Sequence, residues 1–170
     1  MKTLGAVLAG GRSSRFGSDK ALAMLGGRTL LDHAQAALRP HCDALIVVGR
    51  GEGLADWPQP DMGPLGGVAG ALRHAASEGF DQLLTAPVDC LRLPPDLRAL
   101  LEPAPAFLDT QPVIGLWPAA TLAALQAILA DGRDLAVRAY ARRIEARAVR
   151  SDFVPPNINS ADDLRRLAES

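Results

Sequence analysis

The sequence predicts an α/β fold with three layers, in which a mostly parallel β-sheet lies between two layers of α-helices. Short apolar runs alternate with longer segments of helical periodicity, a pattern that is typical of β-α-β units. The apolar runs show no regular polar alternation, as expected for strands that are buried on both faces. The chain has 170 residues, and 48% of them are hydrophobic. We therefore expect residues 1–170 to form a single domain with a substantial core.

The expected strands are short apolar runs bounded by glycine, proline or polar residues, which interrupt regular structure. Gly49 closes the second of these runs and Pro87 closes the third. In chain order, the expected strands are residues 3–8, 44–48, 82–86 and 113–117, with an edge strand at 146–149.

The expected helices show apolar residues at a spacing of 3.6 and recognisable start or stop signals. The first covers residues 30–38 and is stopped by Pro40. Ser160 is a good N-cap for the last helix, with Asp163 as an acidic capping partner three residues later. The other expected helices are residues 66–76, 94–101, 119–130 and 135–143.

The composition argues against several classes of protein. The formal net charge of −1 disfavours a protein that mainly grips a nucleic-acid backbone, because such proteins usually carry a basic surplus. No stretch approaches the roughly 20 apolar residues of a membrane span, so we expect a cytoplasmic protein without a membrane partner. The two cysteines, Cys42 and Cys90, form no CxxC or Cys/His cluster, which disfavours a disulfide or zinc framework. Cys90 is expected to be a packed thiol.

A loop rich in glycine and cations follows the first expected strand, at an edge where parallel sheets bind ligands. Gly10 and Gly11 allow backbone N–H groups to approach an anion closely. Arg12, Arg15 and Lys20 add three cations within nine positions. Arginine can bind phosphate oxygens through two parallel bonds, and lysine acts as a point charge. The loop therefore predicts a triphosphate site, although it is neither a Walker A loop nor a GxGxxG motif. The alternative is a solvated basic turn.

Carboxylates follow two other expected strands. Asp89 lies just beyond the third strand, where it could hold Mg²⁺, since this ion takes one or two carboxylates together with phosphate oxygens and water. The alternative for Asp89 is a capping or turn residue. Asp56 precedes the glycine-rich segment 61–67, which could approach a nucleobase or sugar closely. The alternative for this segment is a plain loop.

Two asparagines, Asn157 and Asn159, precede the last helix. They point to the same side if the backbone there is extended. They could bind a substrate phosphate or a metal-bound water. Asparagine beside a capping serine is also ordinary at a helix start, so this alternative stays open.

Taken in this order, the four motifs resemble those of the molybdenum cofactor guanylyltransferases of the MobA type. The opening motif is Leu8-Ala9-Gly10-Gly11, then Arg15-Phe16-Gly17, then Asp19-Lys20-Ala21-Leu22. The other three are Gly63-Pro64-Leu65-Gly66-Gly67, Pro87-Val88-Asp89 and Asn157-Ile158-Asn159-Ser160. The resemblance spans nearly the whole chain and implies a Rossmann-like nucleotidyltransferase fold.

The resemblance also implies a reaction. The terminal phosphate of molybdopterin attacks the α-phosphorus of GTP, forming the guanine dinucleotide cofactor and pyrophosphate. Mg²⁺ is the implied cofactor, and GTP and molybdopterin are the implied partners, with transient contact to proteins that insert or deliver the molybdenum cofactor. A phosphate nucleophile needs little deprotonation, so the protein must mainly position two anions and neutralise charge.

Carried over by position, the resemblance assigns roles to individual residues. The catalytic residues are Arg15, Lys20 and Asp89, of which Asp89 also holds the metal. The nucleotide-binding residues are Leu8, Ala9, Gly10, Gly11, Arg12, Lys20, Gly49, Asp56, Gly63, Pro64, Leu65 and Asp89. Asn157 and Asn159 lie toward the pterin substrate. The chain departs from the family pattern at Val88 and Gly49. Segment 104–111 is short, so we expect a hairpin of longer relatives to be trimmed.

Two kinds of alternative function stay open. The closest is a related transferase that uses CTP on molybdopterin, or a nucleoside triphosphate on a sugar phosphate. Ala9-Gly10-Gly11 and Gly63-Pro64-Leu65 favour GTP, because close CTP-using relatives usually show Ala-Ala-Gly at the first motif and lack Gly-Pro-Leu at the second. The other is a nucleotide-binding adaptor without catalysis. Asp89 discriminates between the two kinds, because only catalysis requires its carboxylate.

Overall fold

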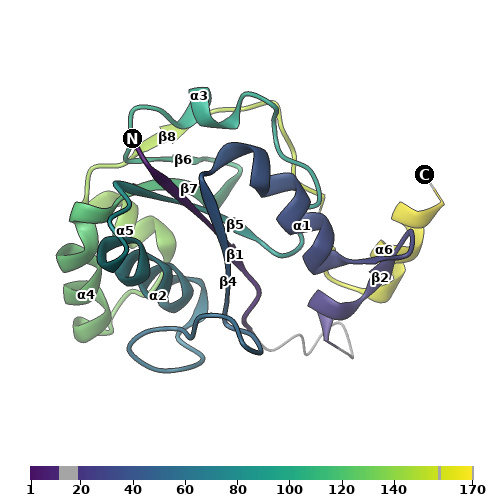
Figure 1. The fold of residues 1–170 in the computed structure, drawn as a ribbon, viewed down its shortest axis with the longest axis horizontal. Helices are drawn as coiled ribbons and strands as arrows, with labels where there is room; N and C mark the ends of the chain where they lie inside the picture. The colour runs from purple at the N-terminus through teal and green to yellow at the C-terminus, as the bar shows by residue number, and fades with distance from the viewer. Residues whose placement is uncertain (12–18, 157, 170) are drawn as a thin grey trace.

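A six-stranded sheet forms the centre of the computed structural model, which describes residues 1–11, 19–156 and 158–169 (Figure 1). From one edge to the other, the strands are β4 (Ala44–Val48), β1 (Thr3–Leu8), β5 (Gln82–Pro87), β7 (Gln111–Pro118), β6 (Ala106–Leu108) and β8 (Arg147–Val149). Strand β1 pairs in parallel with β4 and β5, and β6 pairs in parallel with β8. Strand β7 runs antiparallel to both of its neighbours. The prediction of a mostly parallel sheet is confirmed.

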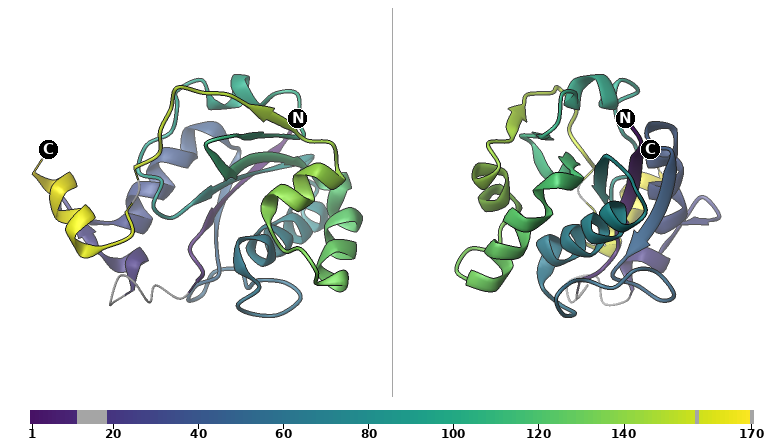
Figure 2. Two further views of the ribbon diagram at one scale, coloured as in Figure 1. Left: turned by 180° about the vertical axis from the view of Figure 1, so that it is seen from behind. Right: turned by 60° about the vertical axis from the view of Figure 1, so that its left-hand side comes forward.

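Helices cover both faces of the sheet. They are α1 (Leu30–Leu38), α2 (Gly63–Ser77), α3 (Leu97–Leu101), α4 (Leu122–Asp131), α5 (Val137–Arg143) and α6 (Ala161–Ala168). One core cluster joins α2, α4 and α5 to one sheet face, and a second joins α1 and α3 to the other face. Figure 2 shows α2, α4 and α5 gathered together. Because side chains alternate along a strand, β1 supplies Ala6 to the first cluster and Val7 to the second. The predicted three layers are confirmed.

Several element bounds follow from local sequence signals. Strands β1 and β4 and helix α1 have the predicted bounds. Helix α1 begins with a capping box in which Thr29 and Asp32 satisfy each other's backbone N–H groups. Ser160 and Asp163 form the same arrangement at the start of α6, as predicted. Helix α2 begins at Gly63, three residues before the predicted start, because Pro64 fits the first turn of a helix.

Segment 104–111 contains a short strand that the sequence analysis did not predict. Residues 106–108 form β6, which pairs with β7 across the turn at 109–110. The strand has only three residues and follows two prolines, Pro103 and Pro105. A segment this short has too little periodicity to be distinguished from a loop by sequence alone.

The remaining elements are short. They are a 3₁₀ helix η1 (Lys20–Leu22), strands β2 (Met24–Leu25) and β3 (Arg28–Thr29), and 3₁₀ helices η2 (Arg39–His41) and η3 (Ala119–Thr121). The C-terminal segment crosses from β8 to the far side of the molecule, where α6 lies beside β2 (Figures 1 and 2). Among the described residues, no helix combines the length and the apolar character that a membrane crossing requires.

Candidate active site

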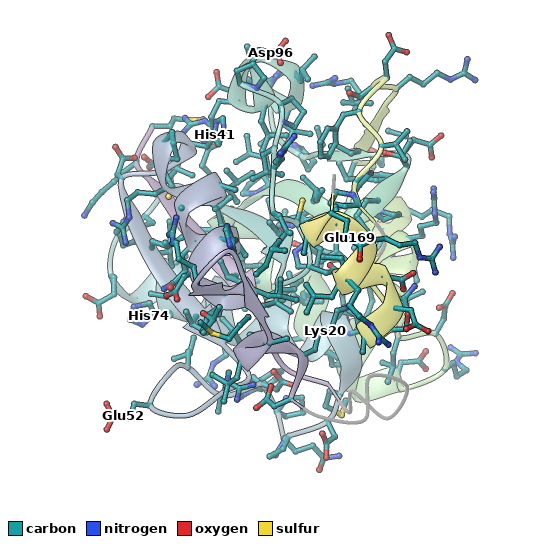
Figure 3. The ribbon with its side chains drawn as sticks, turned by 90° about the vertical axis from the view of Figure 1, so that its right-hand side faces the viewer. Lys20, His41, Glu52, His74, Asp96 and Glu169 are labelled. Carbon is teal, nitrogen blue, oxygen red and sulfur yellow. The ribbon has the colours of Figure 1, made fainter. Side chains whose placement is uncertain are left out.

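A cleft of about 710 Å³ opens at the carboxyl ends of β1, β4 and β5, where Leu8, Val48 and Pro87 contribute to its lining. In Figure 3, His41 lies before β4 at the upper end of the sheet, whereas Glu52, after β4, and Lys20 lie toward the lower end. The cleft brings together ten of the predicted site residues, which are Leu8, Ala9, Gly10, Gly11, Lys20, Asp56, Gly63, Pro64, Asp89 and Asn159. The predicted residues Arg12, Arg15 and Asn157 lie outside the described residues.

Close contact between two strand ends shapes the start of the glycine loop. The Ala9 N–H donates to the Val48 carbonyl over 2.9 Å. At Gly49, which has a φ of +83°, a Cβ would lie 2.6 Å from the Gly10 Cα. Gly11 has a φ of +117° and open space where a Cβ would be. Gly49 therefore supports Gly10 from behind, and the structure does not place it among the described residues that line the cleft.

Lys20 and Asp89 form an ion pair within the cleft. The Lys20 Nζ donates to Asp89 Oδ2 over 2.9 Å, and the two side chains are only 17% and 20% exposed. The Val88 N–H donates to the Leu8 carbonyl over 3.1 Å, which holds the segment after β5 against the end of β1. A partly buried carboxylate of this kind can bind another cation, and its lysine partner can also bind an anion.

Cys90, the residue after Asp89, is a packed thiol, as predicted. It is buried, and its Sγ donates to the Arg92 carbonyl over 3.3 Å. Burial and, secondly, the neighbouring Asp89 charge raise the pKa of the Cys90 thiol to about 12. The thiol is therefore protonated at neutral pH and unsuited to act as a nucleophile.

Glycines on α2 allow the Asp56 segment to lie directly against the helix. The Trp57 N–H donates to the Gly66 carbonyl over 3.1 Å, and a Cβ at Gly70 would clash with the Ala55 carbonyl oxygen. A Cβ at Gly67 would lie 3.6 Å from Asp56 Oδ1. The sequence analysis expected the glycines of segment 61–67 to approach a ligand. In the structure, Gly63 and Gly67 line the cleft. A Cβ at Gly66 would instead meet the side chains of Met62 and Asp56, and Gly70 leaves room for the Ala55 carbonyl.

The environment of Asp56 disfavours its negative charge. Burial, followed by the nearby Asp61 carboxylate, raises the pKa of Asp56 above its ordinary value. Donors from a ligand would compensate for this lost solvation. The site thus offers one half-buried acceptor at the α2 side of the cleft and an ion pair at the β5 side.

Leu65, a predicted nucleotide-binding residue, is not among the described residues that line the cleft. Its side chain is fully buried in the core cluster beneath α2, while its neighbours Gly63 and Pro64 are exposed at the cleft. Successive residues of a helix point about 100° apart, so the position after two cleft-facing residues turns toward the sheet. Leu65 matches the family motif, and its side chain packs in the core beneath α2.

The C-terminal segment supplies another wall of the cleft. Ile158 is fully buried, and the Asn159 N–H donates to Asp163 Oδ2 over 2.9 Å. The same carboxylate takes part in the capping box of α6. The helix start therefore sets the position of Asn159 at the cleft.

Some cleft residues were missed by the sequence interpretation. Asp61 lies within a quoted motif but was given no role, and its positive φ of +63°, which is uncommon for a residue other than glycine, is known only from the structure. Val113 reaches the cleft from β7. No sequence signal could identify Val113, because its position depends on β7 lying next to β5.

The described residues contain no group of three or more His, Cys, Asp or Glu side chains that could hold a metal ion. Among these residues, Asp89 is a candidate ligand because its carboxylate reaches the cleft. Mg²⁺ suits such a site, because it commonly combines one or two carboxylates with phosphate oxygens and water.

Comparisons with known proteins agree with this geometry. Residues 5–149 match the model of the MobA-like NTP transferase domain. The chain is 38% identical to a molybdenum cofactor guanylyltransferase from Acidiphilium cryptum (strain JF-5), over 93% of this chain and 90% of that protein.

Two solved structures share the fold. Molybdopterin-guanine dinucleotide biosynthesis protein A from Archaeoglobus fulgidus superimposes with a TM-score of 0.77 at 21% identity, covering 98% of this chain and 97% of that chain. Rv0371C in complex with manganese, from Mycobacterium tuberculosis H37Rv, gives a TM-score of 0.60 at 19% identity, covering 100% of this chain and 99% of that chain. Because the family model matches residues 5–149 and the chain is 38% identical to the Acidiphilium protein, the chain belongs to the MobA-like NTP transferase family.

Proposed function

We propose that this protein transfers GMP from GTP to the terminal phosphate of molybdopterin, with pyrophosphate as the second product. The observation that carries this proposal is the meeting of Lys20, Asp89, Asp56 and the glycine loop in one cleft beyond the parallel strands. The name of the Acidiphilium relative, molybdenum cofactor guanylyltransferase, supports the choice of nucleotide and acceptor. Handing the product to an insertion or delivery protein belongs to the same proposal.

The loop and Lys20 are proposed to hold the triphosphate. Backbone N–H groups near Gly10 and Gly11 would donate to phosphate oxygens, and Lys20 would add a positive charge. Arg12 and Arg15 are proposed from the sequence to bind phosphates too, with Arg15 acting at the reacting centre. An oxygen of the molybdopterin phosphate forms a bond to the α-phosphorus as the bond from that phosphorus to the bridging oxygen breaks. The electron pair and charge leave with pyrophosphate, so no protein nucleophile takes part.

Asp89 is proposed to hold Mg²⁺ together with triphosphate oxygens. When bound, Mg²⁺ would supply Lewis-acid charge neutralisation at the phosphates. Asp89 would hold the metal, and Lys20, which pairs with Asp89 in this structure, would place its charge near the phosphates. The manganese complex of Rv0371C from Mycobacterium tuberculosis supports a divalent ion in a related fold.

Asp56 and the start of α2 are proposed to recognise guanine. Guanine presents adjacent ring N–H and amino donors, which suit the half-buried Asp56 carboxylate, whereas cytosine presents an amino donor beside a ring acceptor. Gly63 and Pro64 would lie against the base. Asn159 would face the pterin substrate, and Asn157 is proposed for the same role from the sequence.

Product analysis tests the proposed function directly. The protein is incubated with GTP, Mg²⁺ and molybdopterin, and the guanine dinucleotide and pyrophosphate are measured by mass spectrometry and a coupled assay. A thermal-shift titration in Mg²⁺ should show protection by GTP and little protection by CTP. Absence of the dinucleotide with active molybdopterin would overturn the reaction, and stronger protection by CTP would overturn the base assignment.

A further inference from the structure

Arg50 joins two loops that are distant in the sequence. It follows Gly49 at the end of β4, and its guanidinium donates from Nη1 to Asp19 Oδ1 and from Nη2 to Asp19 Oδ2. The two side chains are 22% and 42% exposed. A bidentate pair of this kind restrains orientation as well as distance.

Asp19 in turn restrains the segment that carries Lys20. Its Oδ1 accepts from the Ala21 N–H over 3.2 Å, so the carboxylate caps η1, of which Lys20 is the first residue. Lys20 then reaches Asp89 in the cleft. Two polar contacts, Arg50–Asp19 and Lys20–Asp89, are thus joined through the peptide bond between Asp19 and Lys20, and together they connect the turn after β4 to the segment after β5.

The turn after β4 also holds the first end of the glycine loop. Ala9 is hydrogen-bonded to Val48, and Gly49 packs on Gly10. Arg50 follows these residues and holds Asp19. The end of β4 therefore restrains both described ends of the segment that connects β1 to η1.

We infer that Arg50 is a positioning residue for nucleotidyl transfer, acting through Asp19 to hold Lys20 at the cleft. The kinetic part of this inference rests on the proposed function. Partly exposed ion pairs contribute little to the stability of a fold, whereas small displacements of a positioned group can cost about 100-fold in rate. Loss of Arg50 should consequently reduce turnover much more than it reduces stability.

Kinetics of four variants test the coupling. We expect Arg50→Ala to lower kcat/KM for GTP at least about tenfold, with Arg50→Lys intermediate because lysine cannot make both parallel bonds. Asp19→Asn keeps an oxygen that can cap η1 but loses the charge, and should show a similar loss. The double variant Arg50→Ala/Asp19→Asn should lose no more than about twofold beyond either single variant, since both remove the same contact.

The Lys20→Ala variant tests whether Arg50 acts through Lys20. If Arg50 acts through Lys20, then adding Arg50→Ala to Lys20→Ala should change kcat/KM less than about twofold. An undiminished tenfold loss in that background would overturn the inference. Arg142→Ala is the matched control, because Arg142 pairs with Asp134 at an exposed site on α5, and its kcat/KM should equal that of the wild type.

A crystal structure of Arg50→Ala gives a readout that does not depend on the substrate. We expect η1 to shift and the Lys20–Asp89 contact to be lost. An unchanged Lys20–Asp89 contact would overturn the inference, whatever the enzyme acts on. A wild type that makes no guanine dinucleotide would instead overturn the proposed function, so the two failures are distinguishable.

Discussion

At the residue scale, Asp89 has one cationic partner in this structure and a second, a metal ion, in the proposed reaction. Its carboxylate accepts from Lys20 in this structure, and the proposed reaction requires it to bind a metal. One carboxylate suffices only if phosphate oxygens supply further ligands. The site is therefore expected to be completed by the nucleotide, whose phosphate oxygens would supply ligands that the protein does not.

Asp89→Asn should abolish catalysis and preserve the fold. A metal contributes several kcal/mol to such reactions, and about 1.4 kcal/mol corresponds to a factor of ten, so we expect a loss of at least about 100-fold in pyrophosphate release. The asparagine oxygen can still accept from Lys20, so Tm should stay near that of the wild type. Full activity in Asp89→Asn would show that the metal assignment is wrong.

Asp56→Asn should raise the stability at neutral pH while weakening GTP binding. Because burial and Asp61 raise the pKa of Asp56, the folded protein disfavours the ionised carboxylate. A raised carboxyl pKa adds stability as the pH falls from that pKa through the ordinary value of 3.8. We therefore expect a Tm above that of the wild type at pH 7, by at most about 4 °C, and no difference below about pH 3.5.

Asp61→Asn is the comparison for this prediction. It removes the charge that acts on Asp56, which is the smaller of the two causes, so we expect the pKa of Asp56 to fall only part of the way toward its ordinary value. A lower Tm for Asp56→Asn at pH 7 would show that the protein stabilises this carboxylate instead.

At the element scale, the backbone of segment 55–57 lies directly against helix α2. Glycine in a helix interior costs about 1 kcal/mol relative to alanine, yet α2 contains Gly66, Gly67 and Gly70. The structure explains Gly70 by the Ala55 carbonyl, which lies where a Cβ would project, and Gly66 by the side chain of Met62, with Asp56 beside it. The helix thereby sets the position of Asp56 at the cleft.

Gly70→Ala should destabilise the protein despite the better helix propensity of alanine. Its Cβ would meet the Ala55 carbonyl, which belongs to the backbone and must move. We expect a net loss of about 1–3 kcal/mol and weaker GTP binding, measured by urea unfolding and by titration. Ser77→Ala, at the exposed end of α2, should leave both quantities unchanged. Wild-type GTP affinity in Gly70→Ala would show that α2 does not position Asp56.

At the scale of the whole molecule, the strand order β4-β1-β5 places three strand ends around one cleft. Asp56 and Asp89 belong to segments that follow β4 and β5, and Lys20 follows β1. A ligand that contacts all three segments should stabilise the whole fold, because it binds the folded state and not the unfolded chain.

Metal removal should separate the contributions of nucleotide and cation. At a GTP concentration about 100 times its Kd, binding adds about 2.7 kcal/mol, which a thermal melt detects easily. We expect GTP with Mg²⁺ to raise Tm, and GTP with EDTA to raise it clearly less. In Asp89→Asn the metal-dependent part should shrink. Equal protection with and without the metal would contradict the proposed role of Asp89.

Much of the fold could be predicted because its signals are local. The bounds of β1, β4 and α1, the capping box at Ser160, and the glycine loop depend on residues within a few positions of one another. Strand β6 could not be predicted, since three residues after two prolines carry no periodicity. The family resemblance named ten residues that line the cleft in the structure, but it could not show that the side chain of Leu65 is buried in the core.

The amino-acid sequence by itself determined the alternation of strands and helices, the family, and the set of residues at the carboxyl ends of the strands. Only the tertiary structure decided that Lys20 pairs with Asp89, which is 69 positions away, and that Arg50 holds Asp19. It also decided which glycines of α2 pack against neighbouring residues and which line the cleft. The physical reason is that propensity and periodicity act along the chain, whereas these contacts depend on which strands lie side by side.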